Sequence, residues 1–121
     1  MQKLNDPKTM AKYMGCLSIL EYNTFLLYKS LSEKTETPLA KSLLLSIAQD
    51  SSKHSTLLKG ISNSIANSEA KTKDCAENLG QIWLTVTNYL DEAKTGKVSE
   101  LSLADLYEKL IPLSEKITIL L

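Results

Sequence analysis

The sequence contains a single histidine, His54, in the segment DSSKHSTLLKG, where it follows Ser51 by three residues. Glu21 lies on an earlier segment, ILEYNTF. Apolar residues at helical spacing flank both positions and predict that Glu21 and His54 face inward on two neighbouring helices. A carboxylate and an imidazole placed in this way are either a hydrogen-bonded pair, which satisfies two polar groups that are costly to bury, or two ligands of one metal ion. Both interpretations are open at this point.

The whole chain has the size and composition of one folded domain. Its 121 residues are 43% hydrophobic and 23% charged, which suits a single domain over residues 1–121 with its own core. Fourteen basic residues balance fourteen acidic ones, and every basic residue is a lysine. We therefore expect no nucleic acid and no membrane among its partners. The absence of a signal-peptide pattern and of a long apolar run predicts a cytoplasmic protein.

Two cysteines, Cys16 and Cys75, lie far apart and form no CxxC pair. This spacing is typical neither of a zinc knuckle nor of a thioredoxin-like redox motif. We expect two reduced, mostly buried thiols, with a disulfide as the alternative.

Four segments carry helical periodicity, and the alternation typical of half-buried strands is absent. The predicted helices cover about residues 7–34, 38–66, 75–95 and 102–121. Residues that typically begin, end or kink helices support these limits. They are Asp6, Pro7, Thr37, Pro38, Asp74, Gly96 and, as a kink in the last helix, Pro112.

Each predicted helix has one apolar stripe, so the helices must bury these stripes against one another. The fold class we expect is all-α, an antiparallel four-helix bundle. The connection between the second and third helices, ANSEAKTKD, spans at most about 30 Å when extended. A taut crossover and a simple up-down-up-down order are both compatible with that length.

Residues 19–61 resemble the ferritin-like superfamily, in particular proteins of the rubrerythrin type. The resemblance rests on Glu21, on Tyr28 one heptad later, on the TPLAK hairpin and on IAQDSSKHSTLL. It implies a ferritin-like bundle that commonly dimerises. It also implies di-iron chemistry, either the reduction of peroxide or the oxidation of ferrous iron.

The ligand set that the resemblance implies is incomplete in this chain. Where the family has Glu-x-x-His on the second helix, this sequence has Ser51-Ser-Lys-His54, and the third predicted helix has no inward acidic residue. The best counterpart on the fourth helix is Glu115, with threonine in place of the histidine. The remaining metal ligands, Glu21, His54 and Glu115, are too few for two iron ions. We expect no cofactor, or a single Fe, Zn or Mn ion, rather than a complete di-iron centre.

Three functions follow from these patterns. We expect a non-catalytic structural or interaction bundle, not an enzyme, which forms a homodimer or binds another protein; the C-terminal ITILL either packs inside the bundle or marks the interface. The alternative is a metal-binding oxidoreductase with a reduced site at Glu21 and His54. A remote alternative is a histidine phosphotransfer domain, because HSTLLKG resembles its motif. In that motif the Lys-Gly pair comes two residues earlier, and the histidine is exposed.

Overall fold

The structure is a computed structural model that describes residues 6–66 and 70–94. Within these ranges all regular structure is helical, which confirms the all-α prediction. The elements are α1 (Pro7–Lys34), α2 (Pro38–Ile65), α3 (Thr72–Leu79) and α4 (Gln81–Lys94). None of the helices in these ranges is long and apolar enough to cross a membrane. The predicted helix over 102–121, including Pro112, Glu115 and ITILL, lies outside the described residues.

The limits of α1 and α2 agree with the prediction to within one residue. A proline occupies the first turn of each helix, where its missing N–H costs no hydrogen bond. Asp6 and Thr37 occupy the N-cap positions, although neither side chain bonds a backbone N–H there. Asp6 instead accepts a hydrogen bond from the Thr9 hydroxyl, with 3.0 Å between the oxygen atoms.

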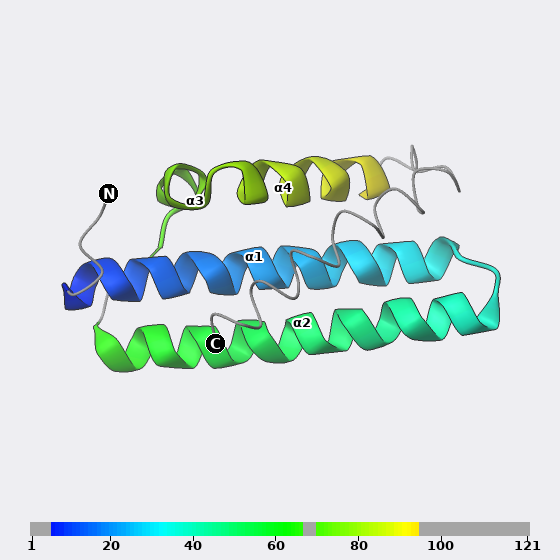
Figure 1. Ribbon diagram of the computed structural model, residues 1–121, viewed down its shortest axis with the longest axis horizontal. Helices are drawn as coiled ribbons and strands as arrows, with labels where there is room; N and C mark the ends of the chain where they lie inside the picture. Colours follow the sequence, from blue (N-terminus) through cyan, green and yellow to red (C-terminus); the bar gives the residue numbers. More distant parts are fainter. Residues whose placement is uncertain (1–5, 67–69, 95–121) are drawn as a thin grey trace.

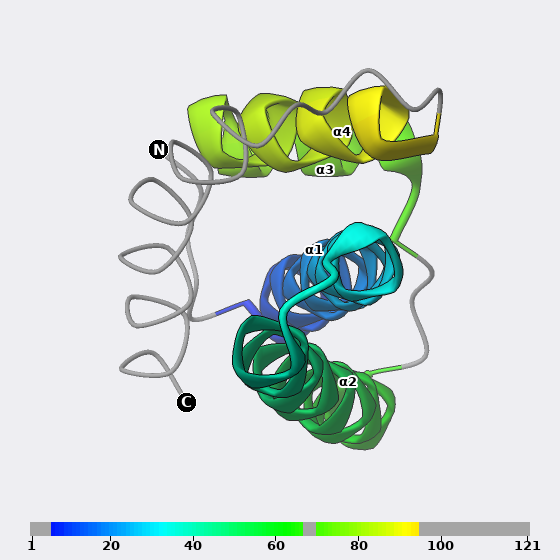
Figure 2. The same ribbon diagram turned by 90° about the vertical axis from the view of Figure 1, so that its right-hand side faces the viewer.

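Among the described helices, α1 is the central one. It lies between α2 on one side and the α3–α4 pair on the other (Figures 1 and 2). Apolar side chains from α1 and α4 form much of the buried core between them. They are Leu17, Leu20, Leu27 and Leu31 from α1 and Trp83, Val86, Leu90 and Ala93 from α4. The helix α1 therefore packs against α2 on one side and against α3 and α4 on the other. These contacts explain why α1 has buried residues around most of its circumference.

The direction of α4 distinguishes a crossover connection after α2 from a simple up-down-up order, both of which were compatible with the sequence. The Lys34 ammonium donates a hydrogen bond to the carbonyl oxygen of Ala93, so α1 and α4 end side by side. The Ser62 hydroxyl donates to the carbonyl oxygen of Ala11 over 2.6 Å, so α2 ends beside the start of α1. The α3–α4 segment begins at that same end and runs parallel to α1 (Figure 1). The described helices therefore follow an up-down-up order with no crossover along the bundle.

The prediction of a single helix over residues 75–95 is wrong, because the structure has two helices, α3 and α4, in its place. Gly80 separates them with a φ of 58° and a ψ of −125°, a positive-φ conformation that glycine adopts without the steric cost of a Cβ. The N–H of Gly80 still donates to the carbonyl oxygen of Ala76, 3.0 Å away, and so closes the last turn of α3. The apolar periodicity continues across this break, which is why it predicted one helix. The segment also begins earlier, at Thr72.

The prediction of two reduced cysteines is wrong as well. Cys16 on α1 and Cys75 on α3 form a disulfide, with their Cα atoms 5.1 Å apart and both side chains fully buried. The two residues are 59 positions apart in the sequence, and this separation carries no information about their distance in space. The disulfide attaches α3 directly to α1, and Cys75 is the one buried residue of this short helix.

Candidate functional site

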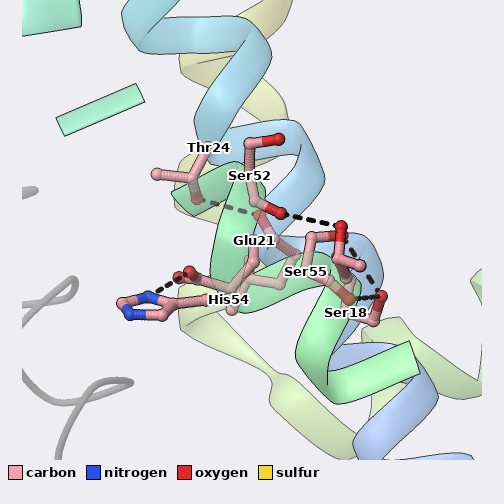
Figure 3. A network of polar contacts seen from close by, with 8 residues as sticks. Ser18, Glu21, Thr24, Ser52, His54 and Ser55 are labelled. Atoms are coloured by element: carbon pink, nitrogen blue, oxygen red, sulfur yellow. Dashed lines mark hydrogen bonds and ion pairs between the residues drawn. The ribbon is translucent and has the colours of Figure 1, made fainter. Parts of the chain in front are cut away.

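The structure brings Glu21 of α1 and His54 of α2 together. The Nδ1 atom of His54 lies 2.9 Å from Oε2 of Glu21 (Figure 3). The carboxylate side chain is 1% exposed, whereas the imidazole is 25% exposed. The structure therefore contains the hydrogen-bonded pair, one of the two interpretations left open by the sequence, with Glu21 at the α1–α2 seam and His54 at its edge.

Burial has a large effect on the Glu21 carboxyl. Desolvation raises the pKa of Glu21 from 4.5 to about 7, and the charge and hydrogen bond of His54 offset only part of this increase. Its second oxygen, Oε1, is buried and has no hydrogen-bond partner among the described residues. A carboxylate in this environment is costly to keep charged, so a large part of the Glu21 carboxyl is protonated near neutral pH.

The imidazole has one nitrogen left for another interaction. Because Nδ1 of His54 is engaged with Glu21, only Nε2 remains, and the ring points away from the serine contacts between the helices (Figure 3). Histidines that bind a metal through one nitrogen usually donate the other N–H to a carboxylate. In this geometry His54 is a possible single ligand through Nε2, and Glu21 is the group that orients it rather than a second ligand on the same ion.

A pair of serines fixes the two helices beside this site. The Ser18 hydroxyl donates to the carbonyl oxygen of Ser55 and the Ser55 hydroxyl donates to that of Ser18, each over 2.8 Å (Figure 3). Such reciprocal bonds need the two backbones to approach closely, which small side chains permit. They set the register that places His54 opposite Glu21.

This serine contact was not predicted from the sequence. Its signal is the recurrence of small polar residues at helical spacing on the α2 face toward α1. These residues are Ser51, Ser55 and Ser62. Serine at such positions is easily read as a solvent-facing residue, although Ser51 and Ser62 are buried.

The other ligand positions of a di-iron centre hold residues that do not fit one. Ser51, one turn before His54, is buried and offers a neutral hydroxyl where the family pattern has a carboxylate. Asp50 is exposed, and no acidic residue is among the buried residues of α4, which are Trp83, Val86, Leu90 and Ala93. Within residues 6–66 and 70–94 no three His, Cys, Asp or Glu side chains lie close enough to hold a metal ion. Glu115, the third predicted ligand, lies outside the described residues.

Comparison with known proteins identifies no relative: no family model, curated protein or solved structure matches this chain.

Proposed function

We propose that this protein is a non-catalytic bundle of ferritin-like type that serves as a structural or interaction module. The observation that supports this function best is the bond between Nδ1 of His54 and Oε2 of Glu21. Because Nδ1 and Oε2 are bonded to each other, these two atoms are not available to a metal ion shared by His54 and Glu21. Their contact gives one oxygen of the buried Glu21 carboxyl a hydrogen-bond partner and joins α1 to α2, which is a structural role.

The ferritin-like assignment is itself part of the proposal. It rests on the likeness of residues 19–61, which form most of the α1–α2 hairpin. The up-down-up order of the described helices favours a simple antiparallel bundle. In that bundle the family's hairpin is retained without its crossover.

The disulfide changes the location that we propose. Protein disulfides persist in oxidising compartments and are rare where thiols are kept reduced. The buried bond between Cys16 and Cys75 therefore favours an oxidising environment over the reducing cytoplasm that the sequence predicted. Counting free thiols in protein taken directly from its source, after rapid acid quenching and alkylation, distinguishes the two.

The second candidate function is a metal site with a single ion, in an oxidoreductase of the peroxidase or ferroxidase type. Two observations favour it: the free Nε2 of His54 and the unpartnered, buried Oε1 of Glu21. An iron, zinc or manganese ion bound by His54 would need further ligands, of which Glu115 is the predicted one. The residues described so far supply one imidazole and one carboxyl, which do not fit a di-iron centre.

Metal stoichiometry tests the proposal. The protein is purified without a histidine tag, incubated anaerobically with Fe(II), Mn(II) or Zn(II), desalted and examined by elemental analysis. The structural role predicts less than about 0.1 equivalent of metal per chain, in the wild type and in His54→Ala alike. One equivalent that is lost in His54→Ala but kept in Lys53→Ala would replace the structural role with the single-ion site, and two equivalents would restore a di-iron oxidoreductase.

A further inference from the structure

The helix α2 has a second apolar face that α1 does not cover. Leu39, Leu43 and Leu57 are 71%, 47% and 53% exposed, and the half-buried Ile61 continues the row by one turn. Successive residues of a helix are about 100° apart, so Leu43 and Leu57 point well away from Leu44 and Leu58, which are buried toward α1. These residues form two small apolar clusters on one side of the helix, Leu39 with Leu43 and Leu57 with Ile61, and the exposed polar residues Asp50 and Lys53 lie between the clusters. Exposed apolar clusters of this kind can mark a protein interface.

The order of residues along this face is nearly symmetric about its middle. Leu43 and Leu57 each lie seven residues from Asp50, and Leu39 and Ile61 each lie eleven residues from it. A second α2 placed antiparallel across a twofold axis at Asp50 would therefore set Leu43 against Leu57 of the partner subunit. It would also set Leu39 against Ile61 of the partner subunit. Such self-complementarity is what a twofold-symmetric interface requires.

The charges in the middle of the face support the same arrangement. Asp50 and Lys53 are both exposed, and they have opposite charge and lie three residues apart. Across an antiparallel pair of helices centred on Asp50, Lys53 of the partner subunit is offset from Asp50 by about 5 Å along the axis. A lysine side chain spans that distance. Two symmetric ion pairs would thus offset the repulsion between the two Asp50 carboxylates at the axis.

From these observations we propose that two copies of this chain form a homodimer through the exposed face of α2, in an antiparallel arrangement with its twofold axis near Asp50. The face from Leu39 to Ile61 extends for about 33 Å at 1.5 Å per residue, and its two apolar clusters lie at opposite ends of it, on either side of Asp50. That length is sufficient for an antiparallel helix seam. The inference rests on the proposed role as an interaction module and names its partner as a second copy of the same chain.

The mass of the protein in solution tests this surface, by light scattering after size exclusion at about 100 μM. The wild type is expected to be a dimer, and Leu57→Lys is expected to be monomeric with unchanged helical content. Leu84→Lys is the matched control, because Leu84 is 50% exposed but lies on α4; this variant is expected to remain dimeric. A monomeric wild type, or a dimer that Leu84→Lys disrupts and Leu57→Lys does not, would overturn the proposal.

A charge exchange tests the antiparallel register. Asp50→Lys alone places lysines against one another at the axis and is expected to raise the dimer dissociation constant by about tenfold. Adding Lys53→Asp restores opposite charges across the interface and should return the constant to within about threefold of the wild type. Failure of this rescue would contradict the register. Dimer mass is measured separately from metal content, so the two proposals can fail independently. A dimer that binds metal would refute the structural role and support the interface. A monomer that binds no metal would refute the interface and leave the structural role intact.

Discussion

His54 and Glu21 form a bond of 2.9 Å between a partly exposed imidazole and a carboxyl that is almost completely buried. The asymmetry of this pair matters for stability. The imidazole reaches solvent through its edge, whereas the Glu21 carboxyl depends on His54 for its one hydrogen bond among the described residues. The two partners should therefore respond differently to substitution.

Replacement of His54 by alanine is expected to lower the free energy of unfolding by about 1 to 3 kcal/mol, because it leaves a buried carboxyl without a hydrogen-bond partner. His54→Gln, whose amide can still donate to Oε2 of Glu21, should recover part of this loss. Urea unfolding at pH 7 followed by circular dichroism measures both. An effect of His54→Ala no greater than that of Lys59→Ala, at an exposed lysine of the same helix, would show that the bond does not contribute.

The dependence of stability on pH should follow from the raised pKa of Glu21. In the folded chain this pKa is about 7, compared with 4.5 for an unburied carboxyl. Between these values the folded state binds a proton that the unfolded state releases, so stability falls as the pH rises from about 4.5 to 7. This stabilisation is present in full well below pH 4.5 and is lost completely only as the pH rises through the folded pKa of about 7.

Glu21→Gln removes this titration while keeping a side chain of the same shape. The stability of the wild type relative to Glu21→Gln should fall by about 1 to 3 kcal/mol between pH 4.5 and pH 7.5. Chemical unfolding of both proteins at several pH values in that range measures the difference. A difference that stays constant, or that grows in favour of the wild type as the pH rises, would mean that Glu21 is not protonated in the folded state.

The sequence predicted the first hairpin well because its signals are local. Pro7 and Pro38 mark two helix starts, and the short segment between the helices permits only an antiparallel hairpin. The facing of Glu21 and His54 followed from the same periodicity.

Features that depend on distances between residues far apart in the sequence could not be predicted from local sequence patterns. The disulfide joins residues of two helices that are not adjacent in sequence, and the parallel direction of α4 depends on contacts such as that between Lys34 and Ala93. The break at Gly80 gave a local signal, a glycine within a periodic segment. The apolar pattern on both sides of it outweighed that signal.

Loss of the disulfide should lower stability substantially. Cys16 and Cys75 are 59 residues apart, and the chain-entropy model assigns a cross-link of that size about 4 kcal/mol. We expect the double variant Cys16→Ser, Cys75→Ser to lose about 2 to 4 kcal/mol, and hydrogen exchange to increase first in α3, whose one buried residue is Cys75. Reductant should destabilise the wild type and leave the double variant unchanged. Equal urea midpoints for the wild type with and without reductant, once mass spectrometry shows two free thiols, would contradict this account.

Two glycines offer opposite tests of backbone conformation. Gly80 has a φ of 58°, so Gly80→Ala is strained even though an added Cβ would meet no atom within 4 Å. We expect it to lose about 1 kcal/mol of stability.

Gly60 lies inside α2, and its added Cβ would likewise meet no atom within 4 Å. Gly60→Ala should therefore gain about 0.5 to 1 kcal/mol, because alanine favours a helix interior. Thermal unfolding of both variants measures the contrast. If Gly80→Ala stabilises the chain as Gly60→Ala does, then α3 and α4 form one continuous helix, as the sequence pattern predicted, and the break at Gly80 is not part of the fold.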